Sequence, residues 1–404
     1  MSRNVPKLRF KGFEDEWKQQ VVSLLFDKVK NPVDVDKNTF YKQIGIRSHG
    51  KGIFYKEEVL GKELGNKRVF WIEPDVFIVN IVFAWERAIA RTTVNEIGMI
   101  ASHRFPMYKP KKNRVNLDYI TYFFKTKKGQ RLLELASPGG AGRNKTLGQK
   151  EFDNLKIKIP SLQEQEKISN FLSKVDSIIE KQEKKVKYWN SYKKGMMQKI
   201  FSQKIRFQDG NKKSYTDWEE VRLSYILTET NNKNTGDLRV CSVSVRKGVI
   251  DQIEHLGRSF AAKDTSKYKL VKKGDLIYTK SPTGEFPYGI IKQSFLEENV
   301  VVSPLYGVFK PKNYYLGYIL HSYFYYKENT NNYLYSIVQK GAKNTINISN
   351  EVFLSKKLNL PTSTDEQIKI FNLLLSIDNI IDKENKKLEE LKQWKKGLLQ
   401  QMFV

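Results

Sequence analysis

Two long stretches of the chain carry apolar residues at intervals that alternate between four and three. The first stretch has Ile168, Leu172, Val175, Ile179 and Val186 in this pattern, and the second has Ile370, Leu374, Ile377, Ile381 and Leu388. Polar residues fill the same two gaps in each pattern, at Gln182 and Lys193 and at Glu384 and Lys395. A spacing of 3.5 residues sustained over this length is the signature of a coiled coil. The pattern predicts two long helices that pack on each other through this seam. The alternative is a helix that packs only on its own domain.

The two stretches are copies of one another. Residues 160–201 and 361–403 align without gaps after a one-residue slip near their start. The aligned identities are Glu164-Gln165 with Glu366-Gln367, Asp176 with Asp378, and Lys193-Lys194-Gly195 with Lys395-Lys396-Gly397. A proline precedes each stretch, and we expect the N-terminal signal to come from Ser161 in the first copy and from Thr362 or Thr364 in the second. A duplication of such long period indicates two units of one design.

Each unit also has a lead-in segment and a domain. The lead-in segment, with Leu8-Arg9-Phe10 and Glu16-Trp17, recurs as Ile205-Arg206-Phe207 and Asp217-Trp218. We therefore predict a first domain at residues 1–159, a first long helix at 160–203, a second domain at 204–360 and a second long helix at 361–404. Because the chain stops where a third lead-in segment would begin, we expect the termini to lie close together in a pseudo-two-fold arrangement.

Short apolar runs predict that both domains are mixed. Strands are expected at 42–46, 76–82, 88–93 and 107–109 in the first domain and at 238–245, 275–278, 290–291 and 305–310 in the second. Helices are expected at 117–126 and 314–326. The predicted fold class is α+β, with two mixed α/β domains and two long helices that form an antiparallel coiled coil.

Charge then narrows the possible partners. The 404 residues carry a formal net charge of +27, which indicates a polyanion, and nucleic acid is the usual one. A membrane surface is the alternative, but no run of 18 apolar residues and no signal peptide occurs, so we expect a cytoplasmic protein. The single cysteine, Cys241, excludes an internal disulfide framework and is expected to be a buried bystander.

A search for catalytic motifs finds no active site. The sequence has no phosphate-binding loop of the G-x-x-x-x-G-K-[ST] type, no H-E-x-x-H motif and no cysteine–histidine metal spacing. Pro74-Asp75 resembles the start of a nuclease motif, but the lysine that should follow is missing. Residues 139–142 are glycine-rich but follow a predicted helix rather than a strand, which argues against a dinucleotide site. We expect neither catalysis nor a metal site.

A nucleic-acid-binding function fits the sequence better than catalysis, because basic residues lie in loops beside glycine, serine and asparagine. Such side chains reach phosphates and the edges of guanine and adenine, although each one could equally be a solvated loop charge. The candidate DNA-binding residues are Arg47, Ser48, His49, Lys51, Arg143, Asn144, Lys145, Arg246, Lys247, Lys280, Ser281, Lys343, Asn344 and Thr345. The loops at 139–147 and 340–346 are the stronger candidates, because a basic glycine loop recurs at the same place in both domains.

Taken together, the sequence resembles the specificity subunit of type I DNA restriction–modification systems. The motifs that carry this resemblance are Ile159-Pro160 with Glu164-Gln165, their echo at Leu360-Pro361 with Glu366-Gln367, the opening Leu8-Arg9-Phe10 with Glu16-Trp17, and the Lys-Lys-Gly-Met-Met-Gln-Lys-Ile-Phe ending of the first helix. The resemblance covers essentially the whole chain. In the two domains the resemblance is limited to the general order of elements and does not extend to individual residues.

The resemblance implies a noncatalytic reader of double-stranded DNA. Each domain would be a target recognition domain for one half of a bipartite, asymmetric site. The long helices would set the spacer between the halves and bind two modification (methyltransferase) subunits, joined by two restriction subunits. S-adenosylmethionine would belong to the modification subunits, and ATP with Mg to the restriction subunits, with no cofactor in this chain. The alternatives are a coiled-coil scaffold with nonspecific nucleic-acid binding and a self-sufficient nuclease or methyltransferase, whose motifs are absent.

Overall fold

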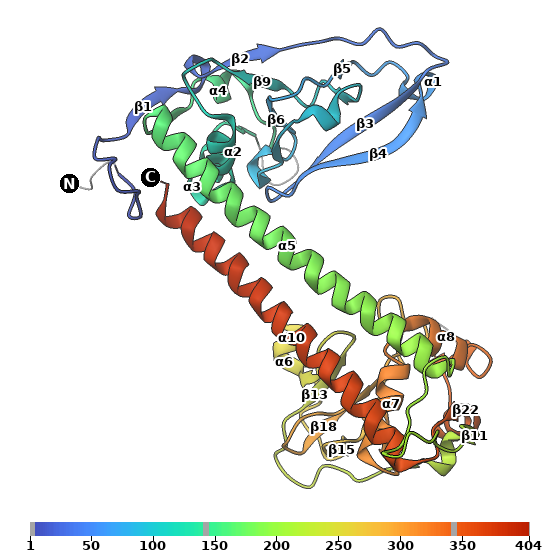
Figure 1. Cartoon of the computed structure of the whole chain (residues 1–404). Helices are drawn as coiled ribbons and strands as arrows, with labels where there is room; N and C mark the ends of the chain where they lie inside the picture. Colours follow the sequence, from blue (N-terminus) through green and yellow to red (C-terminus); the bar gives the residue numbers. More distant parts are fainter. Residues whose placement is uncertain (1–4, 140–144, 341–345, 404) are drawn as a thin grey trace. The chain divides into compact units, whose positions relative to one another are not determined.

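The computed structural model describes residues 5–139, 145–340 and 346–403 and divides into two compact units. Unit 1 consists of Met1–Lys184 and Lys386–Val404, and unit 2 consists of Lys185–Asn385 (Figure 1). Each unit therefore contains one mixed domain together with a part of each long helix. The contacts divide the chain inside the helices, so the four-part division at 159, 203 and 360 stays a prediction.

In the part of unit 1 that the structure describes, there are two four-stranded sheets, in the orders β2-β9-β6-β7 and β4-β3-β8-β5, and a separate β1–β10 pair. Its strands are β1 (Lys18–Val21), β2 (Phe26–Val29), β3 (Phe40–Arg47), β4 (Gly52–Leu60), β5 (Val69–Trp71), β6 (Phe77–Val79), β7 (Ile89–Arg91), β8 (Ile100–Ser102), β9 (Met107–Pro110) and β10 (Lys156–Ile159). Its short helices are η1 (Val22–Leu24), α1 (Gly61–Leu64), η2 (Ala84–Glu86), η3 (Val94–Glu96), α2 (Leu117–Lys125), α3 (Lys127–Leu135) and α4 (Gln149–Asp153).

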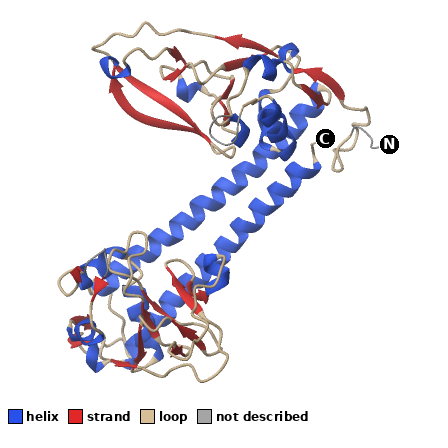
Figure 2. Ribbon diagram, turned by 180° about the vertical axis from the view of Figure 1, so that it is seen from behind, coloured by secondary structure: helices blue, strands red, loops and turns tan. Residues whose placement is uncertain are grey.

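Among its described residues, unit 2 has one four-stranded sheet, in the order β12-β19-β16-β17, and four two-stranded pairs. Its strands are β11 (Glu219–Arg222), β12 (Leu227–Glu229), β13 (Cys241–Ser244), β14 (Gly248–Asp251), β15 (Lys269–Val271), β16 (Leu276–Tyr278), β17 (Ile291–Gln293), β18 (Val300–Val302), β19 (Gly307–Pro311), β20 (Gln339–Lys340), β21 (Ile346–Asn347) and β22 (Lys357–Leu360). Its short helices are η5 (Leu223–Tyr225), α6 (Gln252–Leu256), α7 (Tyr314–Tyr323), α8 (Lys327–Leu334) and α9 (Asn350–Ser355). Figure 2 shows that the strands of each unit lie in its domain and that each long helix runs without a break.

Strand pairing shows that the two domains share one topology. Phe26 pairs with Pro110 in unit 1 as Leu227 pairs with Pro311 in unit 2. The further matched ladders are β1–β10 with β11–β22, β6–β9 with β16–β19, β5–β8 with β15–β18, and β3–β4 with β13–β14. Even the parallel contact of Gln43 with Ile100 recurs, as a bridge between Val240 and Val301. The backbone therefore preserves a duplication that the domain sequences have largely lost.

The long helices are α5 (Leu162–Phe201) and α10 (Thr364–Gln401). A serine hydroxyl receives a backbone N–H at each start, from Glu164 to Ser161 at 3.4 Å and from Glu366 to Ser363 at 3.5 Å. The prediction of Ser161 is confirmed. In the second copy the cap is Ser363 rather than Thr362 or Thr364, because α10 begins at Thr364 and Ser363 occupies the position before it.

Most predicted domain elements are confirmed, with ends that differ by a few residues. The main missed element is β4, the second arm of a long hairpin with β3. Its segment Lys56-Glu57-Glu58 has no alternation of apolar and polar residues and is exposed. Pairing with β3, and not a local pattern, makes this segment a strand at the edge of its sheet.

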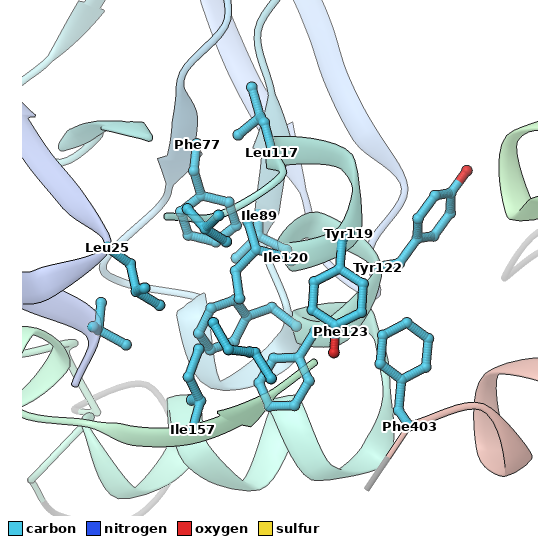
Figure 3. Packing of buried hydrophobic residues seen from close by; sticks show 14 of the residues in the cluster. Leu25, Phe77, Ile89, Leu117, Tyr119, Ile120, Tyr122, Phe123, Ile157 and Phe403 are labelled. Atoms are coloured by element: carbon cyan, nitrogen blue, oxygen red, sulfur yellow. The ribbon is translucent and has the colours of Figure 1, made fainter. Parts of the chain in front are cut away.

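Each domain core continues into the long helices of its own unit. In unit 1, Phe77, Ile120 and Phe123 pack in one cluster with Ile168, Leu172 and Val175 of α5. Phe403, just after α10, lies beside Tyr119 and Phe123, with ring centroids 5.3 and 6.3 Å apart (Figure 3). In unit 2, Ile370 and Leu374 of α10 and Ile200 of α5 join the domain core in the same way. The apolar seam thus also fixes the domains on the helices.

Candidate nucleic-acid interface

The predicted basic turn Arg47–Lys51 connects β3 and β4 and is fixed by backbone contacts. The N–H groups of His49 and Gly50 donate to the carbonyls of Glu86 and Arg87 at 2.7 and 2.9 Å. Both residues have positive φ, 63° and 68°, and a side chain on Gly50 would approach Lys125. Since its backbone is held against η2, the turn presents Arg47, His49 and Lys51 as exposed groups, with Ser48 half-buried.

Lys145 reaches the same element from a distant part of the sequence. Its Nζ lies 5.6 Å from the centroid of the Trp85 ring in η2, a cation–π distance. The structure therefore brings two of the predicted basic segments, Arg47–Lys51 and Lys145, together at η2. Arg143 and Asn144 lie outside the described residues.

In unit 2 the corresponding hairpin turn contains Arg246 and Lys247. Both are exposed, and Lys247 pairs with Glu254 at 3.2 Å. Lys280 follows β16 with a positive φ of 54°, and burial followed by the charge of Lys269 lowers its pKa, while Ser281 is exposed. Among the described residues of unit 2, no hydrogen bond or ion pair joins these two turns. Lys343, Asn344 and Thr345 lie outside the described residues.

Sequence reasoning missed that the two basic turns belong to equivalent hairpins. It also missed the aromatic residues beside the first turn. The ladders pair Arg47 with Gly52 and Ser244 with Gly248, so Arg47 ends its strand, whereas Arg246 lies within the turn of the equivalent hairpin. The Arg47 guanidinium lies 5.0 Å from the centroid of Phe54, whose ring packs over Gly45 on the opposite strand. An arginine shortly before a glycine turn in both domains was the available signal.

Ion pairs within each unit show that the helices run antiparallel. In unit 1, Asp176 of α5 pairs with Lys395 of α10, and Glu183 of α5 pairs with Lys392. Residue numbers therefore rise along α5 in the direction in which they fall along α10. In unit 2, Lys185 pairs with Glu384 at 2.7 Å and Lys193 with Asp378 at 2.5 Å, again in opposite order.

The predicted seam positions are mostly buried. Ile168, Leu172, Val175, Ile370, Leu374, Ile377, Ile381 and Leu388 are buried, and Ile179 and Val186 are half-buried. The polar gap residues Gln182, Lys193 and Glu384 are also buried, whereas Lys395 is half-buried. The gaps in the apolar pattern are therefore positions where the seam accommodates polar groups. Three of these residues, Lys193, Glu384 and Lys395, form ion pairs just described.

A tyrosine of each domain completes a three-residue cluster with the aligned aspartate and lysine. The Tyr122 hydroxyl of α2 donates to Asp176 at 2.7 Å, and that of Tyr318 in α7 donates to Asp378 at 2.5 Å. Burial, with the neighbouring carboxylate, raises the pKa of both tyrosines, so both remain donors. The aligned Asp and Lys thus join the two helices and the domain in each unit.

In each aligned Glu-Gln pair, the glutamate holds the lead-in segment and the glutamine holds the start of the long helix. Arg9 donates to Glu164 at 2.8 Å, and Arg206 donates to Glu366 at 3.0 Å, with both carboxylates almost fully buried. The amides of Gln165 and Gln367 donate to the carbonyls of Pro160 and Pro361 at 3.0 and 2.8 Å. These residues therefore have an anchoring role, which explains why both copies retain them.

The two ends of the chain lie close together in unit 1 (Figure 1). They make the contact that, in unit 2, joins the end of α5 to the lead-in segment that follows it. The N–H of Leu8 donates to the carbonyl of Gln401 at 3.0 Å, and the N–H of the equivalent Ile205 donates to that of Lys199 at 3.2 Å. The prediction that the termini lie close together is confirmed.

Comparison with known families identifies the chain. The family model for the type I restriction modification DNA specificity domain matches residues 38–188 and 213–393, one match for each domain and the helix that follows it. The chain belongs to the type I specificity family. The expected resemblance is confirmed.

Relatives of the type I specificity family match most of the chain. The MjaVIII specificity subunit from Methanocaldococcus jannaschii is 26% identical over 360 residues, which cover 83% of this chain and 80% of that protein. The S subunit of M. genitalium has a TM-score of 0.58 at 14% identity, over 99% of both chains. A chain from a structure of type I R-M complex assembly and conformational transition has a TM-score of 0.53 at 14% identity, over 96% and 97%. These structures support the α+β fold with two mixed domains and two long helices.

Type I specificity subunits are noncatalytic, and this chain is such a subunit. Cys241, the single cysteine, is buried in β13, and burial raises the pKa of its thiol to about 11. Within residues 5–139, 145–340 and 346–403, no group of three His, Cys, Asp or Glu residues is placed to hold a metal ion. None of the described helices is long and apolar enough to cross a membrane.

Proposed function

We propose that this specificity subunit reads a bipartite, asymmetric site in double-stranded DNA, with one half-site for each domain. The observation that carries the proposal is the combination of shared strand pairing with different exposed turns. The hairpin β3–β4 has arms of eight and nine residues with aromatic and basic side chains, whereas β13–β14 has arms of four residues each. Two domains of one topology with different loops suit two different half-sites.

The basic turns at Arg47–Lys51 with Lys145 and at Arg246–Lys247 are proposed to approach the DNA. Their arginine and lysine groups are exposed or half-buried and can reach phosphates or base edges, and the backbone of the Arg47–Lys51 turn is held against η2. The net charge of +27 supports association with a polyanion. The loops that contain Arg143, Asn144, Lys343, Asn344 and Thr345 remain part of this proposal.

The long helices are proposed to set the spacer between the half-sites and to bind two modification subunits, to which two restriction subunits are added. In this proposal S-adenosylmethionine is bound by the modification subunits, and ATP with Mg by the restriction subunits. The modification subunits would methylate adenine after turning it out of the duplex. The complex would act on DNA in the cytoplasm.

Exchange of residues 208–360 for the matching domain of a related subunit tests the two-reader proposal. Methylated adenines are mapped along single DNA molecules from cells that contain the native chain, the exchanged chain or neither. One half of the methylated site should change, while the other half and the spacer stay the same. Cells without the gene serve as the control, because the split motif should vanish there.

A change in both halves would contradict the assignment of one half-site to each domain. If the native chain, supplied with its modification subunits, gave no split motif but still bound DNA of any sequence equally, the scaffold alternative would replace the proposal.

A further inference from the structure

Unit 2 contains a hollow of about 350 Å³ whose charged lining is mostly lysine. Lys272 and Lys273 lie in the turn between β15 and β16, and Lys310 and Lys312 flank Pro311 at the end of β19. Tyr314, the first residue of α7, also lines the hollow, so the partial positive charge of a helix N-terminus adds to the four ammonium groups.

The turn that carries two of these lysines is held in place. The N–H of Lys272 donates to the Asp275 carboxylate at 2.8 Å, and that of Gly274 donates to the carbonyl of Ser294 at 2.8 Å. Gly274 has a φ of +91°, and a Cβ there would lie 3.1 Å from the Tyr314 ring. The lysines therefore project from a fixed backbone.

Unit 1 has the same two lysines on either side of a proline at the end of a strand, but each of them pairs with a carboxylate. Since Pro110 and Pro311 occupy one register position, Lys109 and Lys111 correspond to Lys310 and Lys312. In unit 1, Lys109 pairs with Glu73 at 3.4 Å and Lys111 with Asp27 at 3.6 Å.

Both carboxylates are absent from the matching positions of unit 2. The ladders place Phe77 opposite Tyr108 and Leu276 opposite Phe309, so Glu73 corresponds to Lys272. By the β2 and β12 ladders, Asp27 corresponds to Thr228. One acidic partner is replaced by a base and the other by a neutral residue.

The hollow of unit 2 is left with an excess of positive charge. Lys273 pairs with Glu297 at 2.6 Å, but among the described residues no carboxylate lies within 4 Å of the ammonium groups of Lys272, Lys310 or Lys312. The carboxylate of Asp275 accepts from the turn backbone and is buried, and burial raises its pKa. Three exposed cations around a hollow at a helix N-terminus are a suitable site for a phosphate group.

We propose that this lysine pocket binds a phosphate group, and that the group is a backbone phosphate of the DNA at the half-site read by the second domain. The identity of the DNA as ligand rests on the proposed function. Such a contact positions the domain on the duplex without reading sequence. The neutralised counterpart in unit 1 makes the contact specific to the second domain.

The test uses the full chain with Lys272→Glu, which recreates the acidic residue found at Glu73 of unit 1. Binding to a duplex is measured from low to high salt. The variant should bind all sequences more weakly, and the slope of log K against log salt should fall in magnitude by about 1. Lys383→Glu on α10 is the control, because it makes the same charge change outside the domain and should keep the native slope. Equal melting temperatures exclude a folding defect.

Lysine acetylation read by mass spectrometry gives a second measurement on the native chain. Duplex DNA should protect Lys272, Lys310 and Lys312 from the reagent, and Lys383 should label at its free rate. If the chain binds DNA while all four lysines label freely and the Lys272→Glu slope is unchanged, the pocket proposal is overturned and the proposed function stands.

If the native chain binds no duplex at all, the proposed function fails, and inorganic phosphate decides the fate of the pocket. Protection of the three lysines by millimolar phosphate would support a phosphate site but overturn its assignment to DNA. The absence of protection would overturn the site itself.

Discussion

Among single residues, the two matched ion pairs between the helices differ in burial. The side chains of Lys193 and Asp378 are 5% and 25% exposed, whereas those of Lys395 and Asp176 are 24% and 37% exposed. A charge that loses its partner in a buried place costs far more free energy than one that water can reach. The duplication therefore provides two versions of one contact in different surroundings.

Asp378→Asn should lower the free energy of unfolding by about 3 kcal/mol, because it leaves the buried Lys193 without a carboxylate. Asp176→Asn, the matched control, should lower it by only about 1 kcal/mol, because Lys395 is better solvated. Denaturant unfolding of the full chain measures both values. Equal losses would show that burial does not set the strength of these pairs.

Lys292 of β17 is a buried lysine that faces a second cation. Its Nζ lies 4.2 Å from the centroid of Tyr325, and Lys193 of α5 lies 4.8 Å from the same ring. Burial, followed by the charge of Lys193, lowers the pKa of Lys292 to about 7, although Asp378 of α10 opposes this. Buried His321 of α7 also faces the group, and burial lowers its pKa well below the usual value.

Stability should therefore rise with pH between about 7 and 10.5, the folded pKa and the ordinary pKa of Lys292. In this window the unfolded chain binds the proton and the folded chain does not, so each pH unit favours the folded state. His321 takes up a proton on unfolding only at lower pH. Below pH 7, Lys292 is charged in both states and the burial penalty is present in full.

Lys292→Met should raise stability by about 4 kcal/mol near pH 7, because the pKa of Lys292 falls from 10.5 to about 7 and one pKa unit corresponds to about 1.4 kcal/mol. The gain should shrink toward zero by pH 10. Thermal unfolding across this range compares the variant with the native chain. A gain that does not depend on pH would mean that packing, and not charge, is responsible.

Among the elements, the lead-in segments show how a short stretch is fixed to a long helix. Trp218 donates its indole N–H to Glu366 at 3.1 Å, beside Arg206. In unit 1 the indole N–H of Trp17 is buried without a partner among the described residues, so Glu164 depends more on Arg9. The second lead-in segment is also tethered directly to α5, because only three residues separate Phe201 from Ile205.

Arg9→Leu should therefore release its lead-in segment more than Arg206→Leu releases the second. Hydrogen exchange of the Leu8 and Ile205 amides is the measurement, because each donates to the end of a long helix. We expect exchange at Leu8 to speed up at least tenfold in Arg9→Leu, with a smaller change at Ile205 in Arg206→Leu, as about 1.4 kcal/mol corresponds to tenfold. A larger effect at Ile205 would contradict the anchoring scheme.

At the scale of the whole molecule, the contact of Leu8 with the end of α10 repeats the contact of Ile205 with the end of α5. In unit 2, Phe201 and Ile205 are joined by three residues, and in unit 1 the equivalent Phe403 and Leu8 belong to the two ends. The hydrogen bonds are the same in both cases.

A circular permutant with Val404 linked to Met1 and new ends between Gln203 and Lys204 should fold and yield the same methylated site as the native chain. Its stability should change by less than about 2 kcal/mol, because the opened connection is short and exposed. Adenine mapping and unfolding measure the two outcomes. A permutant opened inside α5, between Lys181 and Gln182, is the control and should fail, because it cuts a continuous helix.

The sequence by itself determined the duplication, the two long helices and the family. Periodic apolar positions such as Ile168 and Ile370 act through neighbours three and four residues away, so a local pattern predicts the helices. The Glu-Gln pairs and the lead-in arginines were visible as repeated letters, although their partnership was not. The basic turns could be located because glycine, arginine and lysine mark exposed loops.

Only the tertiary structure decided which residues meet. The strand β4, the joining of Lys145 to Arg47–Lys51 at η2, and the pairing of Lys193 with Asp378 all depend on contacts between distant positions. The equivalence of Glu73 with Lys272 required strand register, because the domain sequences have diverged too far to align there. A helix follows from neighbouring residues, whereas a sheet, an ion pair or a pocket exists only once distant segments of the chain have packed together.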